Sequence, residues 1–127
     1  SGYRAMRELL DLKDRPTAVF AGNDVVAYGA MQAIQDAGLS IPEDISLAGF
    51  DDDYLSRYLN PPLTTVTQPA AGLGEAAARL LLKQILSTSD SSAPINTKSD
   101  ETEGHRIILP TVLAQRESCR SVHHEQQ

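Results

Sequence analysis

The chain has 127 residues, of which 41% are hydrophobic and 22% charged, a composition typical of one globular domain rather than of a disordered or fibrous protein. No apolar run approaches the roughly 20 residues that a membrane-spanning helix needs, so we expect no membrane association. The formal net charge is -6, and such a surface repels the phosphate backbone of nucleic acids. The single cysteine, Cys119, excludes an internal disulfide and favours a reducing, cytoplasmic location.

Helical and strand-like patterns alternate in the first part of the chain. Residues 3–13 carry apolar side chains at helical spacing, and residues 18–21 form a short apolar run after a turn. Asn23 and Asp24 are common helix caps, and they open a predicted helix that ends at Gly38. This order of helix, strand and helix predicts an α/β arrangement.

Two further strands are predicted in the middle of the chain. One covers residues 45–50 and leads directly into Asp51, Asp52 and Asp53, and the other covers residues 63–68. Strands that alternate with helices form parallel sheets, and ligands of such sheets bind at the carboxyl ends of the strands. We therefore expect an α/β fold with a parallel sheet.

Three successive strands end in polar groups. Asn23 and Asp24 follow the first strand, Asp51 follows the second, and Gln68 ends the third. Each group could simply cap the next helix, because Asn and Asp are common caps, and for any one position alone that interpretation is the better one. Three such junctions in a row favour a binding site at this edge.

The second part of the chain is less uniform. Residues 70–86 predict a strong helix whose charged side chains are restricted to Glu75, Arg79 and Lys83. It should be buried on more than one side, or it needs a partner that this chain lacks. The Ser-rich residues 87–103 predict a flexible connection.

A last strand is expected within residues 105–115, and residues 117–127 are expected to form a disordered tail. His123 and His124 could catch a metal adventitiously, but a functional metal site in a polar tail is not predicted, and neither is a cofactor.

Several motifs resemble one family in their order and spacing. They are "AVFAGNDVVAYGAM", "IPEDISLAGFDD", "PPLTTVTQP", "LGEAA" and "RIILPTVLAQRES". Together they resemble the effector-binding core of LacI/GalR-type bacterial transcription regulators, which share their fold with periplasmic sugar-binding proteins. The resemblance implies a partial, parallel-sheet periplasmic-binding-protein-like type I fold. Residues 1–116 would form the C-terminal part of the effector-binding domain, with a helix that packs on an N-terminal subdomain outside this chain.

The resemblance also implies roles for single residues. Asn23 and Asp51 correspond to positions that contact the effector in the family, and Gln68 occupies a position that lines the cleft in some members. A carboxylate can accept hydrogen bonds from two neighbouring hydroxyls, and an amide can donate and accept at once. This chemistry suits a sugar or another polyhydroxyl compound, with a nucleobase as a further option.

The remaining acidic residues have structural interpretations. We expect Asp52 and Asp53 to begin a short helix toward Tyr58, where carboxylates favour the positive helix end. Asp24 is expected to cap its helix or to orient a ligand residue rather than to contact the effector itself.

A homodimer is expected from a second set of side chains. Tyr28 and Met31 lie on a face of their predicted helix that differs from its core stripe, and Tyr58 and Leu59 precede a Pro-Pro turn. Large apolar groups outside a core stripe are candidate interface residues. In the family, the corresponding helix and loop contribute to the dimer.

The expected function is allosteric control of operator binding by a small effector, without catalysis, and DNA contact only through a headpiece that this chain lacks. Two rivals remain. One is a periplasmic sugar-binding protein of a transport system. The other is a magnesium-dependent phosphatase, because Asp51 and Asp53 follow a strand with the Asp-x-Asp spacing of haloacid-dehalogenase-like enzymes. Leu55 stands where those enzymes usually have Thr or Val, which disfavours the phosphatase.

Overall fold

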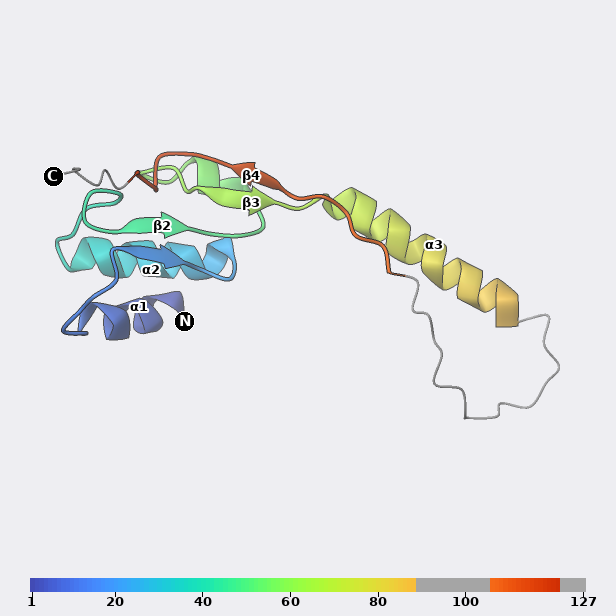
Figure 1. Ribbon diagram of the computed structural model, residues 1–127, viewed down its shortest axis with the longest axis horizontal. Helices are drawn as coiled ribbons and strands as arrows, with labels where there is room; N and C mark the ends of the chain where they lie inside the picture. The colour runs from blue at the N-terminus through green and yellow to red at the C-terminus, as the bar shows by residue number, and fades with distance from the viewer. Residues whose placement is uncertain (89–105, 122–127) are drawn as a thin grey trace, which may run out of the picture. The chain divides into compact units, whose positions relative to one another are not determined.

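The computed structural model describes residues 1–88 and 106–121, and its chain divides into two compact units (Figure 1). The main unit comprises Ser1–Gln68 and Thr111–Gln127, and the helical unit comprises Pro69–Pro110. Every predicted site residue falls within the main unit.

The main unit alternates helices and strands in the predicted order. Its elements are α1 (Gly2–Leu10), β1 (Ala18–Phe20), α2 (Asp24–Asp36), β2 (Ser46–Ala48), the 3-10 helix η1 (Tyr54–Arg57), β3 (Thr65–Thr67) and β4 (Val112–Ala114). The predicted strands are confirmed in position, but the regular pairing covers only three residues in each.

The strands follow the expected parallel arrangement. β1 pairs with β2 in parallel, and two isolated parallel bridges, Ala48 with Thr64 and Asp51 with Thr67, connect the β2 segment to the β3 segment. β4 runs antiparallel to β3. The mixed α/β class with parallel strands is therefore confirmed, with one antiparallel strand added by the segment that returns from the helical unit.

The core of the main unit lies between α2 and the strands, and α1 packs along α2 (Figure 1). A methyl group at Gly2 would lie 1.9 Å from the carbonyl oxygen of Val26, so only glycine permits this close approach of the two helices. The buried apolar side chains are Met6, Ala21, Ala27, Ala30, Met31, Ala33, Ile34, Ile41, Ile45, Leu47 and Leu63.

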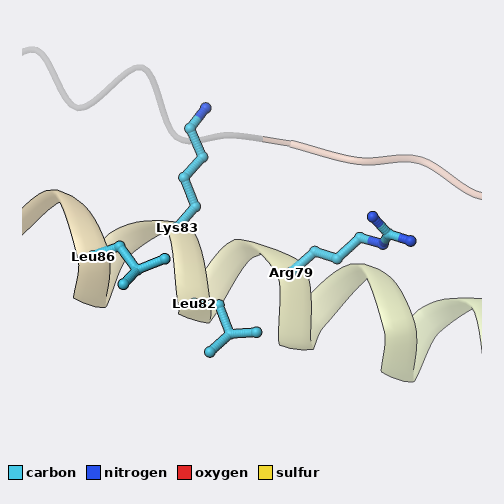
Figure 2. Close-up of a pocket in the computed structure, with 4 residues that line it drawn as sticks. All are labelled: Arg79, Leu82, Lys83 and Leu86. Atoms are coloured by element: carbon cyan, nitrogen blue, oxygen red, sulfur yellow. The ribbon is translucent and has the colours of Figure 1, made fainter.

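The helical unit contains α3 (Ala70–Thr88), which extends two residues into the segment predicted to be a flexible connection. Arg79 and Glu75 form an ion pair with a distance of 2.7 Å between side-chain nitrogen and oxygen. Figure 2 shows Arg79 and Lys83 on one side of the helix and Leu82 and Leu86 on another, around an open hollow. Leu82 and Leu86 are largely exposed in this chain.

The expected disordered tail is wrong for its first residues. Ser118 is fully buried, its carbonyl accepts the Leu47 N–H at 2.8 Å, and its hydroxyl accepts the Thr64 N–H at 2.7 Å. Cys119 and Arg120 also form hydrogen bonds to the segment 42–47. These bonds attach residues 118–120 to the strands. Residues 89–105 and 122–127, with most of the predicted connection and both tail histidines, lie outside the described residues.

Within residues 1–88 and 106–121, no helix combines the length and the hydropathy required to cross a bilayer.

Candidate functional site

The segments that follow β1, β2 and β3 lie together at one edge of the main unit. The Ala21 N–H donates to the Ala48 carbonyl at 2.8 Å, and the Asp51 N–H donates to the Val66 carbonyl at 3.0 Å. Gln68 Nε2 donates to Asp51 Oδ1 at 2.5 Å. The structure therefore brings two of the three predicted effector residues, Asp51 and Gln68, into direct contact.

Asn23 serves first as the N-cap of α2. Its backbone is extended, with φ at -157°, and its Oδ1 accepts the Val26 N–H at 2.8 Å. This satisfies one of the backbone donors that every helix start leaves unpaired. Asn23 and Asp51 are both expected to contact the effector, and the Asp51 side chain accepts its hydrogen bond from Gln68. The cap uses the side-chain oxygen of Asn23, and its amide nitrogen is the donor that a ligand could use.

The acidic turn, which we define as residues 51–53, has an unusual backbone. The φ angle is 106° at Asp51 and 53° at Asp52. Such left-handed conformations are natural for glycine, and they cost other residues about 1 to 3 kcal/mol each. Backbone strain of this size persists only where the surrounding contacts over-determine the conformation.

Asp52 is not a helix cap, which corrects the sequence-based expectation. Its Oδ1 accepts a hydrogen bond from Arg116 Nη2 at 2.5 Å, and its Oδ2 accepts one from the Thr67 hydroxyl at 2.9 Å. The side chains of Arg116 and Asp52 are 17% and 13% exposed, so this ion pair is largely shielded from water. The hydrogen bond from Arg116 is the main reason that the pKa of the Asp52 carboxyl lies below its usual range.

Asp24 is the buried carboxylate of the edge, with only 1% exposure. It accepts hydrogen bonds from the Ser56 hydroxyl at 2.5 Å, the Thr65 hydroxyl at 2.6 Å and the Asp53 N–H at 2.8 Å. A Cβ on Gly49 would lie 2.2 Å from Asp24 Oδ1, so the glycine leaves room for the carboxylate. Asp24 is not the N-cap of α2, because Asn23 has that position, and none of these three partners is a predicted effector residue.

Asp53 is the cap that the sequence predicts. Its Oδ1 accepts the Leu55 N–H at 3.0 Å at the start of η1, and it also accepts the Tyr28 hydroxyl at 2.8 Å. The Leu55 N–H, followed by Tyr28, lowers the pKa of Asp53. Burial is the largest cause that raises the pKa of Tyr28 to about 12.

Two residues of the edge were missed in the sequence. Phe20 ends β1, a strand whose middle residue alone is partly buried, and its side chain is 65% exposed, which is unusual for a phenylalanine. The one signal in the sequence is position: Phe20 lies three residues before the helix cap Asn23, where the strand ends. Arg116 gives no local signal, because its partner Asp52 lies 64 positions earlier in the chain.

The residues predicted at a dimer interface differ in exposure. Tyr58 is 65% exposed and its ring lies 5.1 Å from that of Tyr54. Met31 is only 5% exposed and belongs to the core, so its predicted place outside the core stripe is wrong. Tyr28 and Leu59 are partly buried against that core. A hollow of the main unit is lined by Tyr28, Met31, Gln32, Gln35, Leu59 and Asn60.

The acidic turn does not offer a set of carboxylates for a metal. The phosphatase interpretation rests on Asp51 and Asp53. Asp51 accepts a hydrogen bond from Gln68 Nε2, and Asp53 accepts hydrogen bonds from the Leu55 N–H and the Tyr28 hydroxyl. In the part of the chain that the structure describes, no group of three or more metal-binding side chains occurs. The geometry therefore gives the magnesium-phosphatase interpretation no support.

Comparisons with known proteins agree on one family. Residues 1–119 match the model of the periplasmic binding protein-like domain. The HTH-type transcriptional repressor PurR of Erwinia tasmaniensis is 50% identical over 116 residues, which cover 91% of this chain and 31% of that protein. The chain thus spans less than a third of the length of this curated relative.

Solved structures give the same result. The lac repressor dimer bound to operator and the anti-inducer ONPF matches with a TM-score of 0.74 and 32% identity, covering 94% of this chain and 37% of that one. A LacI family transcriptional regulator from Enterococcus faecium with bound ribose matches with a TM-score of 0.72 and 34% identity, covering 96% and 40%. The chain belongs to the periplasmic binding protein-like domain family, in the form found in the effector-binding domains of LacI/GalR-type transcriptional regulators.

Proposed function

We propose that the protein containing this chain is a cytoplasmic, non-catalytic transcriptional regulator whose operator affinity is set by a small effector bound at the edge of the main unit. The observation that carries the proposal is the Asp51 carboxylate, which is exposed at the end of β2 and oriented by Gln68. An exposed carboxylate held by an amide accepts hydrogen bonds from two adjacent hydroxyls. Repressors and ligand-bound regulators among the relatives support this assignment.

A sugar is the effector class that we propose. Phe20 presents an exposed ring at the same edge, and sugar rings and nucleobases both pack on aromatic faces. The regulator from Enterococcus faecium contains bound ribose, which favours the sugar over a nucleobase. Asn23 would supply its amide nitrogen as a donor while its oxygen caps α2.

Calorimetric titration of the full-length protein with D-ribose, D-glucose, cellobiose, adenine and guanine tests both the site and the effector class. We expect a sugar to bind and Asp51→Ala to abolish the binding heat. The matched control is Asp11→Ala, which removes an exposed carboxylate that follows α1. Binding by a nucleobase alone would replace the sugar assignment, and unchanged affinity in Asp51→Ala would refute the site.

Regulation requires that the effector bind one conformation of the protein better than another, because only differential affinity can shift an equilibrium. The expected coupling is about 1 to 3 kcal/mol, which is several-fold to a hundred-fold in operator affinity. With a net charge of -6, this chain is not the DNA-binding surface, so we propose that a headpiece elsewhere in the protein contacts the operator. A periplasmic sugar-binding protein would bind the same sugar but would not retard operator DNA in a gel-shift assay.

We also propose a homodimer through the surface formed by Tyr28, Tyr58 and Leu59, with the core residue Met31 lining the hollow beside them. The lac repressor matched above is a dimer, and the exposed ring of Tyr58 and the hollow beside Leu59 supply apolar surface for such a contact. In sedimentation experiments, Tyr58→Arg should dissociate the dimer. The control Leu12→Arg changes another exposed apolar residue of the main unit and should leave the dimer intact.

A further inference from the structure

Two neighbouring carboxylates of the acidic turn, those of Asp51 and Asp52, differ in their exposure to solvent. Asp51 is exposed and contacts Gln68, whereas the side chain of Asp52 is 13% exposed. Both residues have a positive φ, so the turn does not hold this shape by backbone preference. Contacts from elsewhere in the chain must maintain it.

Arg116 supplies the strongest of these contacts. Its Nη1 donates to the Leu63 carbonyl at 2.7 Å, and its Nη2 donates to Asp52 Oδ1 at 2.5 Å. Its own N–H donates to Thr64 Oγ1 at 3.0 Å. The planar guanidinium is therefore fixed on the segment before β3 and reaches the turn from there, which is geometry that a lysine cannot reproduce in full.

The second oxygen of Asp52 is bound to the same region. It accepts the Thr67 hydroxyl at 2.9 Å, and the Asp52 N–H donates to Thr65 Oγ1 at 3.3 Å. Gln68, the next residue after Thr67, binds Asp51. Consecutive residues of the turn are thus attached to consecutive residues at the end of β3.

We infer that Asp52 and Arg116 form a positioning pair, which holds the strained turn so that the carboxylate of Asp51 stays at the edge in its effector-binding orientation. The inference rests on the proposed role of Asp51. Neither Asp52 nor Arg116 contacts the effector in this scheme, and both act through Asp51. Arg116 lies two residues after β4 ends, so the pair also attaches the segment that returns from the helical unit to the effector site.

Loss of the pair should be measured as loss of affinity. Without Arg116 the turn relaxes toward conformations with negative φ, and the apparent dissociation constant rises as the reciprocal of the fraction that keeps the binding geometry. If one molecule in ten keeps it, the Arg116→Met protein binds about tenfold more weakly. Arg116→Lys retains the charge with one donor group, so it should recover part of the affinity.

The experiment uses the full-length protein and the five compounds named above, D-ribose, D-glucose, cellobiose, adenine and guanine. Dissociation constants are measured by calorimetry for Asp51→Ala, Arg116→Met and Arg116→Lys. Arg120→Met is the matched control, because Arg120 lies in the same segment and its guanidinium binds only the Pro42 carbonyl among the contacts of the described residues. Hydrogen exchange of the backbone amides of residues 51–53 is measured in the same proteins without any compound.

Three outcomes support the inference together. Arg116→Met exchanges faster at residues 51–53 and binds more weakly than the wild type. Arg120→Met does neither, and Arg116→Lys recovers part of both properties. Unchanged exchange in Arg116→Met overturns the inference even if none of the five compounds binds. If Arg116→Met keeps its affinity while Asp51→Ala loses it, the inference about the pair is wrong but the proposed function stands. Unchanged affinity in Asp51→Ala overturns the proposed function as well.

Discussion

The junction after β1 and the acidic turn after β2 place similar side chains at the same edge, but their backbones differ. At the first junction, Asn23 is extended with φ at -157° and caps α2 through a local hydrogen bond. At the second, Asp51 and Asp52 have φ at 106° and 53°, and the contacts that hold them come from β3 and from Arg116. One junction uses a conformation that any residue adopts, and the other depends on distant parts of the chain.

The difference indicates where function is concentrated. A cap stabilises the fold whether or not a ligand exists, whereas a strained turn reduces stability and is retained where it presents a group in a required orientation. Asp24 connects the two junctions, because it follows Asn23 in the chain and accepts the Asp53 N–H. Substitutions at these positions can therefore separate structural from functional roles.

Replacing Asp24 should have the largest effect on stability. Asp24→Ala leaves the Ser56 hydroxyl, the Thr65 hydroxyl and the Asp53 N–H without their acceptor. Unsatisfied buried donors predict a loss of about 3 kcal/mol in the free energy of unfolding. Urea denaturation of the full-length protein measures this, with Asp11→Ala as the control that should change little. A loss below about 1 kcal/mol would mean that the two junctions are not connected through Asp24.

The Asp52 carboxylate should make the acidic turn sensitive to acid. Its pKa is lowered in the folded protein, chiefly by Arg116, so its contribution is present above the unfolded pKa of about 3.9 and is lost as pH falls through the lower folded value. At pH 7 we expect Asp52→Asn to cost about 2 kcal/mol, because the charged hydrogen bond to Arg116 becomes a neutral one.

Unfolding free energies of the wild-type and Asp52→Asn proteins, measured from pH 7 to pH 2, test this sign. The gap between the two curves should close as the pH falls below about 4. A gap that stays constant over this range would show that the ion pair does not stabilise the turn.

Asn23 offers a smaller and more selective test. Asn23→Ala removes the acceptor of the Val26 N–H and should cost about 1 kcal/mol of stability. Asn23→Asp retains a capping oxygen but replaces the amide nitrogen, so its stability should stay close to that of the wild type. If Asn23→Asp nevertheless weakens effector binding in calorimetry, the residue has both roles. Equal affinities of wild-type and Asn23→Asp proteins would assign Asn23 to the cap alone.

Local rules explain which parts of this site the sequence could predict. The caps at Asn23 and Asp53 were predicted because their partners lie two or three residues away, and the edge was predicted because parallel strands align their carboxyl ends. The capping rule also led to the wrong expectation that Asp52 begins the short helix. The partners of Asp52 lie 15 and 64 positions away, so no spacing in the sequence indicates them.

The same distinction explains the errors outside the turn. Met31 was placed outside the core because helical spacing alone does not show how wide the buried face is. Residues 118–120 were placed in a tail because their polar side chains carry no strand pattern, yet Ser118 is buried through hydrogen bonds to Leu47 and Thr64. These errors share one cause, which is that contacts with residues far away in the chain leave no pattern in the local sequence.

Substituting Asp51 with glycine and with alanine isolates the strain itself. Both substitutions remove the carboxylate and its contact with Gln68, but only glycine adopts a φ of 106° without cost. Asp51→Gly should therefore be more stable than Asp51→Ala by about 0.5 to 1 kcal/mol, while both lose effector affinity. Urea denaturation compares the two variants, with calorimetry for binding. Equal stabilities of the two variants would show that the backbone at position 51 is not strained. The acidic turn would then resemble the junction after β1.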